Sequence, residues 1–434
     1  MKSKFSFAML FISGLIYCQV VSRVQIDKNA KVIDLFLNSD CTRSIAVCEK
    51  GSQGFYQSGN MKIGPFEKKS LMLSYVCYDG SIIAVNYEKK NKQFLQINNT
   101  FYGPYNEAFI SEFPEKSCIT GFFYEDIKGK SFVKIGSKTF GPYKVVSLPV
   151  LSNDVSKYGF FYSKDAFEYY VQINSLTFGP LNNVDKIYLS PNGLFYGFVY
   201  MDEENYYVQI NENKFGPYQN VGSITLADNG SFGFTYISDD EFYALINDEL
   251  FGAFDWCKPP IFSADGLAYL MSYKKNKKYY ADNKNKTYGP YDEVLKSYIS
   301  RDGMKFSFAY RLNDKWFLQL NDNKTEGPYD EILSSSFSND AASHTICYKS
   351  GGKIFIKIND DNYGPVDSYK GTNYSQDGKK YGFTYKQNNN SFIQLNGKVF
   401  GPYEAANCNF SADGTIFITY KIIGENFICI EKIN

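Results

Sequence analysis

The sequence predicts an all-β protein built from about eleven short repeats, and three recurring patterns carry this prediction. A Gly-Pro-aromatic mark, altered only at Leu181, Ala253 and Val366, recurs every 36 to 39 residues between Gly64 and Gly401. A Ser-x-Asp/Asn-Gly turn recurs in phase with it, and so does a short alternating run that often reads Gln-Ile-Asn, as in Tyr207–Asn211. Self-similarity at a fixed period is the signature of a repeat architecture. Outside the first residues, no run of helical periodicity interrupts the pattern.

The composition agrees with a strand-rich, well-packed protein. The 434 residues are 44% hydrophobic, and 38 Tyr and 38 Phe stand against only 2 Trp. Aromatic residues favour strands because they fit a pleated, half-buried surface. Lys plus Arg and Asp plus Glu number 46 each, and no basic tract is present. We therefore expect no nucleic-acid partner.

The segment Asn183–Tyr218 illustrates one repeat, in which we expect four antiparallel strands named a to d. Strand a precedes the Ser-x-Asn-Gly turn, and strand b follows it and ends near Tyr200. Strand c is the alternating run, and strand d leads into Gly216-Pro217-Tyr218. Asn-Gly between apolar runs predicts a tight hairpin turn of type I′. Proline cannot donate to a strand ladder, so strand d should lie at an edge.

The two chain ends complement each other. We count eleven sets of strands a to c but only ten d strands, since the last unit stops at Phe427–Glu431. At the other end, Val24–Asp27 lies outside the first set and resembles a strand of the repeat. We expect this amino-terminal segment to complete the last unit and so to close the array without a covalent link.

The Ser-x-Asp-Gly turn followed by an aromatic strand resembles the WD-type and Tol-B-like β-propeller repeats over residues 24–434, although no Trp-Asp pair or Gly-His signature is present. The resemblance implies blade-shaped units around an axis, with binding on one face. It predicts a β-propeller array over residues 23–434. The eleven units form one large ring or two tandem rings, split near residue 254 into six and five units at the irregular junction Phe251–Pro260. An open β-solenoid is a further alternative.

The amino terminus has the features of a signal peptide. Lys2 and Lys4 precede the apolar run Phe5–Tyr17, which is too short to span a bilayer. We expect a signal peptide over residues 1–22 with cleavage after Ser22, and lipidation of Cys18 as a lipid anchor is the alternative. The predicted location is secreted or periplasmic, with no transmembrane segment.

Eight cysteines follow the predicted signal peptide at irregular spacing. An even number in an exported chain permits disulfides. Most of them fall in strand-like runs, where a free cysteine behaves as a small buried apolar residue. We expect them to be mostly unpaired.

Catalytic patterns are missing from the sequence. There is no Gly-x-Ser-x-Gly, and the single histidine, His344, lies in an apolar strand-like run. A Ser-His-Asp triad and most metal sites are therefore improbable, and we predict no catalytic, cofactor-binding or metal-binding residues. The recurring tyrosines should pack between units. Function is better sought where a unit departs from its siblings, at Pro114, Trp256, Trp316 and the turn Lys274–Lys278.

The sequence therefore favours a non-catalytic, exported β-propeller that acts as a protein-binding or ligand-binding scaffold. The alternative is a carbohydrate-binding or carbohydrate-active propeller. The expected partner is a protein or a carbohydrate of unknown identity, and no cofactor is expected.

Overall fold

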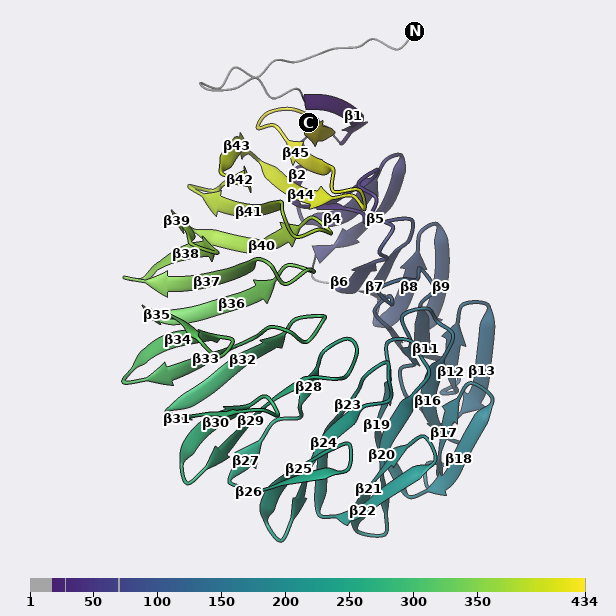
Figure 1. Ribbon diagram of the computed structural model, residues 1–434. Coiled ribbons are helices and arrows are strands. Elements are labelled where there is room, and N and C mark those ends of the chain that lie inside the picture. Colours follow the sequence, from purple (N-terminus) through teal and green to yellow (C-terminus); the bar gives the residue numbers. More distant parts are fainter. Residues whose placement is uncertain (1–17, 28, 69–70, 434) are drawn as a thin grey trace. The chain divides into compact units, whose positions relative to one another are not determined.

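The computed structural model describes residues 18–27, 29–68 and 71–433 of the chain, and these residues form an eleven-bladed β-propeller (Figure 1). Each blade is a sheet of four antiparallel strands in the order a-b-c-d. The described residues contain no α-helix. The predicted all-β fold, the repeat count and the four-stranded unit are confirmed.

The strands follow one another in chain order, and in blades 4 and 7 strand a is interrupted into two short strands. Blade 1 comprises β2 (Lys31–Leu37), β3 (Ser44–Lys50), β4 (Gln53–Ser58) and β5 (Met61–Glu67), and blade 2 comprises β6 (Leu71–Val76), β7 (Ile83–Lys89), β8 (Lys92–Ile97) and β9 (Thr100–Tyr105). Blade 3 comprises β10 (Glu107–Ile110), β11 (Gly121–Glu125), β12 (Ser131–Ile135) and β13 (Lys138–Tyr143). Blade 4 comprises β14 (Val145–Val146) with β15 (Val150–Leu151), β16 (Tyr158–Ser163), β17 (Tyr169–Ile173) and β18 (Leu176–Leu181). Blade 5 comprises β19 (Asn183–Leu189), β20 (Tyr196–Asp202), β21 (Asn205–Ile210) and β22 (Asn213–Tyr218), and blade 6 comprises β23 (Asn220–Leu226), β24 (Phe232–Ser238), β25 (Glu241–Ile246) and β26 (Glu249–Phe254). Blade 7 comprises β27 (Trp256–Cys257) with β28 (Ile261–Phe262), β29 (Tyr269–Lys275), β30 (Lys278–Asp282) and β31 (Thr287–Tyr291). Blade 8 comprises β32 (Glu293–Ile299), β33 (Phe306–Leu312), β34 (Lys315–Leu320) and β35 (Lys324–Tyr329). Blade 9 comprises β36 (Glu331–Phe337), β37 (His344–Ser350), β38 (Lys353–Ile358) and β39 (Asp361–Val366). Blade 10 comprises β40 (Ser368–Tyr374), β41 (Tyr381–Gln387), β42 (Asn390–Leu395) and β43 (Lys398–Tyr403). Blade 11 comprises β44 (Ala405–Phe410), β45 (Ile416–Lys421) and β46 (Phe427–Ile433) with β1 (Cys18–Gln25).

The turn between strands a and b differs from the predicted type I′ hairpin. In blade 5, strand a ends at Leu189 and strand b begins at Tyr196, and the Gly193 amide donates to the Ser190 carbonyl at 2.9 Å. Gly193 has a φ of 68°, whereas Asn192 is not among the residues with positive φ. A type I′ turn needs positive φ at both central residues. The prediction was wrong because the Ser and Asn side chains hold a wider loop.

Two-residue turns with positive φ at both positions occur instead between strands b and c. Asn313 and Asp314 in blade 8 have φ values of 52° and 60°. Asn388 and Asn389 in blade 10 have φ values of 51° and 64°. Asparagine and aspartate tolerate this left-handed conformation better than most residues, so the b–c turns are the tight hairpins of this fold.

The recurring tyrosines pack neighbouring blades together, as predicted. Tyr218 at the end of blade 5 stacks on Tyr236 of blade 6, with ring centroids 4.1 Å apart. Tyr291 of blade 7 stacks on Tyr310 of blade 8 at the same distance of 4.1 Å. Such pairs contribute roughly 0.5–1.5 kcal/mol beyond the area they bury. The Gly-Pro-Tyr mark is therefore a joint between blades.

Blade 11 is completed by the amino-terminal strand, which confirms the prediction from the two chain ends. Strand β1 pairs antiparallel with β46, and Val24 lies opposite Ile428. Residues 1–17 of the predicted signal peptide lie outside the described residues. Cys18 to Ser22 belong to β1, so cleavage after Ser22 would leave only Arg23, Val24 and Gln25 paired with β46.

Blade 1 packs directly on blade 11. The Val32 amide donates to Glu404 Oε1 at 2.9 Å, and Glu404 also forms an ion pair with Lys421. The side chain of Lys421 is only 5% exposed. Leu35 of blade 1 shares a buried cluster with Ile428 of blade 11. First and last blades in contact distinguish this propeller from an open solenoid.

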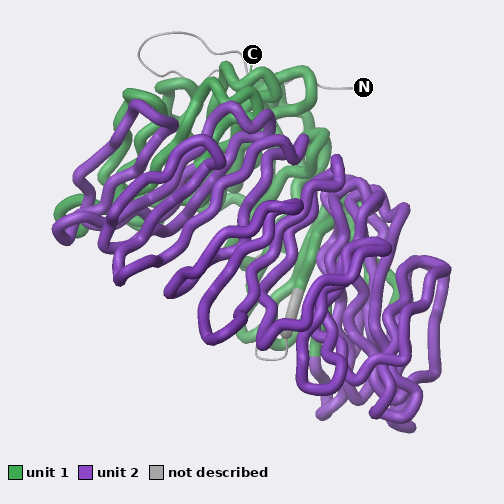
Figure 2. The backbone as a smooth tube through the Cα atoms, turned by 60° about the horizontal axis from the view of Figure 1, so that its bottom comes forward, with its two compact units in different colours: residues 1–87, 96–100, 336–434 green, residues 88–95, 101–335 purple. Residues whose placement is uncertain are grey.

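Contacts divide the chain into two compact units (Figure 2). Unit 1 comprises residues 1–87, 96–100 and 336–434, and unit 2 comprises residues 88–95 and 101–335. Unit 1 contains blades 1, 10 and 11 complete, and unit 2 contains blades 3 to 8 complete. The signal peptide and the division near residue 254 stay predictions.

The thiols of this fold are mainly buried and free. The buried cysteines that form no disulfide are Cys41, Cys48, Cys257, Cys347, Cys408 and Cys429. Burial raises the pKa of the Cys257 thiol to about 12, which keeps it protonated and unreactive at neutral pH. Cys77 and Cys118 are each disulfide-bonded. Within the described residues, no helix has the length and hydropathy needed to cross a bilayer.

Candidate functional site

Unit 2 contains a groove with a cavity volume of about 730 Å³, which we call the turn groove. Its walls come from the loops that join strands a and b in blades 3 to 8 and from the neighbouring strand ends. Six successive repeats therefore contribute to one cavity. This is the size range of small-molecule and peptide sites in proteins.

The recurring residues of each a–b turn are used inside the turn itself. In blade 7, the Ser263 hydroxyl donates to Asp265 Oδ1 at 2.6 Å, and the Leu267 amide donates to the same oxygen at 3.0 Å. The Ala268 amide donates to Ser263 Oγ at 3.1 Å. These hydrogen bonds, that from Ser263 first, lower the pKa of Asp265, because they stabilise the ionised carboxylate. The Ser and Asp of the repeat are thus structural.

The residue between the recurring Ser and Asp varies from blade to blade. Across the regular turns it is Ser39, Tyr78, Asn153, Pro191, Asp228, Ala264, Arg301, Asn339, Gln376 and Ala412. The turn groove is lined by five of these residues, which come from five successive blades: Asn153, Pro191, Asp228, Ala264 and Arg301. In each of these blades the variable residue lines the groove, together with recurring turn residues such as Asp154, Asn192 and Ser263.

Hydrogen bonds tie neighbouring turns together along the groove. The Asn153 amide donates to the Pro191 carbonyl at 2.9 Å, and the Ala264 amide donates to the Arg301 carbonyl at 3.0 Å. Pro191 has no N–H, and at this position the Asn192 amide donates to Asp228 Oδ1 at 2.7 Å. The variable side chains are therefore displayed from a connected backbone, which favours a pre-formed site.

Charges of both signs and apolar groups line the turn groove. Glu115, Asp154 and Asp228 are acidic, and Lys116 and Arg301 are basic. Half-buried apolar side chains lie between them, including Leu226, Ile261 and Phe262.

The acidic and basic groups of the groove differ in their hydrogen bonding. Glu115 Oε2 accepts from the Asn153 amide group at 3.1 Å, and Asp154 Oδ1 accepts from the Ser152 hydroxyl at 2.9 Å. Among the residues that the structure describes, none forms an ion pair or hydrogen bond with the exposed side chains of Lys116 and Arg301. The two cations are therefore free to meet a partner.

The residues that the sequence singled out are only partly at this site. Pro114 immediately precedes Glu115 and Lys116 of the groove wall. Trp256 lies in β27 with its ring edge-on to Tyr279 at 6.2 Å, and Trp316 lies in β34. Neither tryptophan lines the groove, and His344 begins strand β37, as expected for a strand residue. Alignment of the repeats on their Ser-x-Asp-Gly turns would have found the variable position.

The comparisons with known proteins do not place the chain in a family. No protein-family model matches it, and no curated protein matches it. One similar solved structure is described as a crystal structure of the eukaryotic initiation factor. It has a TM-score of 0.43 and 11% identity, and the match covers 73% of this chain and 96% of that chain. A likeness of this size carries no argument about function.

Proposed function

We propose that the protein is a non-catalytic, exported binding scaffold that recognises its partner in the turn groove. The main observation behind the proposal is that each a–b turn combines recurring residues, which form its hydrogen bonds, with one variable residue. Five successive blades build the same turn from recurring residues and carry a different residue at one groove-lining position of that turn. Repeat proteins that bind partners vary surface positions in this way while keeping their packing residues.

The chemistry of the groove favours a partner with mixed polarity, such as a segment of another protein. Lys116 and Arg301 offer cations, Phe262 and Ile261 offer apolar contact, and turn carbonyls and amides offer hydrogen bonds. Interfaces typically combine an apolar centre with charged groups that set orientation. The carboxylates at the groove accept hydrogen bonds from their own or the adjacent a–b turn, which supports binding in preference to acid–base chemistry.

The proposal can be tested by selecting peptides from a random display library on the purified protein. We expect selected peptides to lose at least tenfold in affinity for the double variant Lys116→Glu with Arg301→Glu, which reverses two charges that can contribute about 1–2 kcal/mol each. The matched control is Lys138→Glu with Lys398→Glu, two exposed residues on d strands with the same change in charge. Binding that is the same in both double variants would refute the groove as the site.

A glycan array with the same three proteins tests the carbohydrate alternative. Binding of glycans that depends on the groove residues, or release of sugar from a bound glycan, would replace the proposed scaffold by a carbohydrate-specific protein. If peptides bind through the groove and glycans do not, the scaffold proposal is supported.

Export is tested separately by cell fractionation and mass spectrometry of the amino terminus. We expect the protein outside the cytoplasm with a mature terminus at Arg23. A lipid mass on Cys18 would support the lipid anchor instead. An intact Met1 on a cytoplasmic protein would contradict export.

A further inference from the structure

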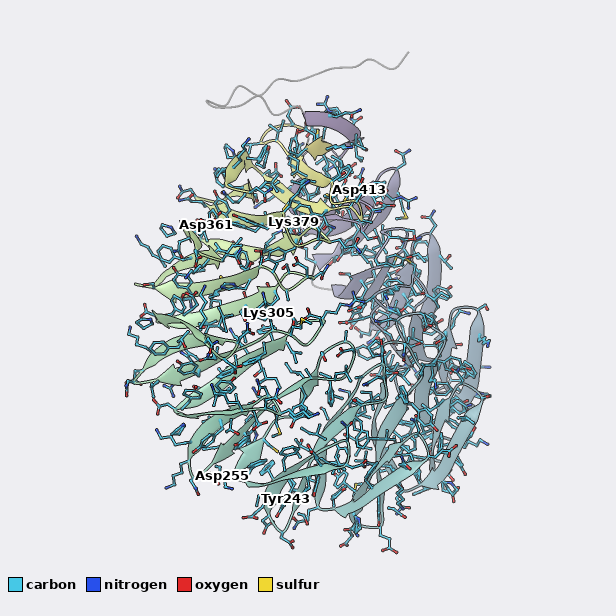
Figure 3. All side chains as sticks on the ribbon, in the orientation of Figure 1. Tyr243, Asp255, Lys305, Asp361, Lys379 and Asp413 are labelled. Carbon is cyan, nitrogen blue, oxygen red and sulfur yellow. The ribbon has the colours of Figure 1, made fainter. Side chains whose placement is uncertain are left out.

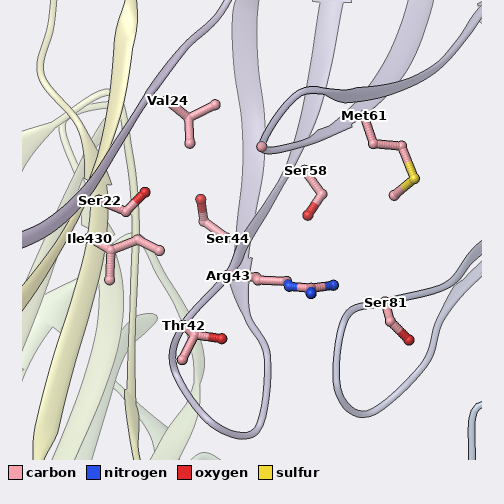
Figure 4. A pocket seen from close by; sticks show the side chains of 10 residues that line it. Ser22, Val24, Thr42, Arg43, Ser44, Ser58, Met61, Ser81 and Ile430 are labelled. Carbon is pink, nitrogen blue, oxygen red and sulfur yellow. The ribbon is translucent and has the colours of Figure 1, made fainter.

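A second cavity lies in unit 1, where β1 passes over the first blade (Figure 4). Its volume is about 220 Å³. It is lined by residues of β1 and β46, by the a–b loop of blade 1 and the adjoining end of β3, by the ends of β4 and β5 with the turn between them, and by Ser81 of blade 2. None of these residues belongs to the turn groove, so this second cavity, which we call the arginine pocket, is an independent site.

Arg43 is the charged group among the residues that line the arginine pocket. Its backbone is fixed by Asn38, because the Arg43 amide donates to Asn38 Oδ1 at 2.9 Å and the Asn38 amide donates to the Arg43 carbonyl at 3.1 Å. Figure 4 shows the guanidinium extending toward Ser58 and Ser81. No hydrogen bond or ion pair links this guanidinium to another residue in the described part of the chain.

Asp40 is the nearby carboxylate, and it is already occupied by its own loop. Its Oδ1 accepts from the Thr42 amide at 2.9 Å and also from the Thr42 hydroxyl and the Asn38 side chain. Desolvation raises the pKa of Asp40, and these hydrogen bonds together with the charge of Arg43 outweigh it and lower the pKa. Asp40 lies outside the pocket lining. The exposed guanidinium of Arg43 therefore lies near Asp40 without an ion pair to it, and it can bind an anion at the cavity.

Two serine hydroxyls in the pocket wall lack partners although they are nearly buried. Ser44 is 4% exposed and Ser58 is 9% exposed. Neither hydroxyl hydrogen-bonds to any residue that the structure describes, and both residues line the cavity. A ligand with acceptor oxygens in the cavity would accept hydrogen bonds from both hydroxyls.

Part of the remaining wall is apolar. Val24 of β1, Met61 of β5 and Ile430 of β46 line the same cavity. An unpaired guanidinium beside hydroxyl donors matches an oxyanion, since arginine binds carboxylate and phosphate groups with charge-assisted hydrogen bonds. The apolar wall matches a short hydrocarbon body attached to that anion.

We propose that the arginine pocket binds a small organic oxyanion, with its charged head against Arg43, Ser44 and Ser58 and its apolar body against Val24, Met61 and Ile430. The head can be a carboxylate or a phosphate or sulfate group, which share the same acceptor chemistry. This site does not depend on the turn groove or on its partner.

Isothermal titration of the purified full chain tests the proposal with butyrate, butyl phosphate, butyl sulfate and inorganic phosphate, and with butylamine as the cationic probe. We expect saturable binding of at least one butyl anion, weaker binding of inorganic phosphate, and none of butylamine. Arg43→Gln should weaken anion binding by at least about tenfold, and Ser44→Ala by about threefold to tenfold, in line with charged and neutral hydrogen bonds. Which butyl anion binds best identifies the head group.

The control is Arg301→Gln, which removes an arginine from the turn groove and should leave anion binding unchanged. Circular dichroism and the urea midpoint of Arg43→Gln confirm that its fold is intact, as expected for an exposed side chain. Ser58→Ala provides a second, uncharged variant of the same pocket. The proposal is overturned if no butyl anion binds at millimolar concentration, or if a folded Arg43→Gln variant binds it as tightly as the unchanged protein.

Discussion

Blades 5 and 11 have the same four-stranded order but are assembled in different ways. Blade 5 is one continuous segment, Asn183–Tyr218, and its a–b turn contributes Pro191 and Asn192 to the turn groove. Blade 11 combines three carboxy-terminal strands with β1, and it contributes Val24 and Ile430 to the arginine pocket, whereas Ser22 at its rim is removed if cleavage follows Ser22. In the regular blades, the groove-lining residues include one variable position of the a–b turn. In blade 11, the strand β1 contributes residues that do not belong to the repeat pattern, and these residues line a cavity of a different kind.

The largest expected effect concerns the ion pair where blade 11 meets blade 1. Glu404→Ala leaves the buried Lys421 ammonium without its carboxylate and the Val32 amide without its acceptor. We expect the free energy of unfolding to fall by about 3–5 kcal/mol, as for other broken buried pairs. Urea unfolding followed by tyrosine fluorescence measures it.

An exposed ion pair provides the control for this prediction. Lys278 Nζ lies 2.7 Å from Asp292 Oδ1, and its side chain is 49% exposed. Lys278→Met should cost less than about 1 kcal/mol. Equal losses for Glu404→Ala and Lys278→Met would mean that the joint between blades 1 and 11 contributes no more than a surface contact.

The next effect separates the turn glycines of the two blades. Gly193 in blade 5 has a φ of 68°, and an added Cβ would lie 2.8 Å from the hydroxyls of Ser152 and Ser156 in blade 4. Gly414 in blade 11 has a φ of 75°, but its added Cβ would meet only Ser375 Cβ at 3.9 Å. We expect Gly193→Ala to cost about 2–4 kcal/mol, from backbone strain plus overpacking, and Gly414→Ala about 1–2 kcal/mol from strain alone.

The same urea unfolding assay measures the loss in free energy of unfolding for both glycine variants. Both variants carry an identical change at the same repeat position, so each is the control for the other. If Gly414→Ala is as destabilising as Gly193→Ala, the close packing of successive turns is not what requires glycine.

The smallest effect is a difference in acid stability. The turn of blade 11 has Asp413 (Figure 3), where blade 5 has Asn192. Hydrogen bonds from the Ser411 hydroxyl and then from Thr415 lower the pKa of Asp413 to about 2. Because the folded pKa lies below the unfolded value of about 3.9, this stabilisation is present above pH 4 and is lost as the pH falls toward 2. Asp413→Asn should therefore reduce the fall in melting temperature between pH 4 and pH 2.

Calorimetry at several pH values between 2 and 5 measures this difference. Asp265→Asn in blade 7 is the second variant and should act in the same direction, because turn hydrogen bonds, that from Ser263 first, also lower the pKa of Asp265. Unchanged pH profiles in both variants would show that the turn carboxylates contribute nothing to acid stability.

The sequence predicted the parts of the fold that depend on periodicity. The four strands of each unit, the completion of blade 11 by the segment at Val24 and the packing role of Tyr218 follow from spacing alone. The a–b turn was mispredicted because side-chain hydrogen bonds from Ser190 and to Asn192 widen it, and backbone propensity does not include them.

The candidate site was harder to predict from the sequence. The variable turn residues are small, polar or charged in no common pattern, and only the fold shows that Asn153 and Arg301 line one groove. The arginine pocket was even harder to predict from the sequence, because Arg43 and Ile430 are distant in sequence and belong to no motif. Residues that looked exceptional, such as Trp256, turned out to lie away from both cavities.

The pairing of β1 with β46 also has a consequence for biosynthesis. The ribosome makes β1 before the other strands of the propeller and makes β46 last, whereas the other described strands find their sheet neighbours within their own repeat. Throughout translation, the growing chain therefore presents an unmatched strand at its beginning and an open sheet edge at its end. Exposed strand edges invite association with other chains. A ribosome that stalls before Phe427 would release a product with both edges open, so synthesis of β46 is the step that allows blade 11 to cover these two edges.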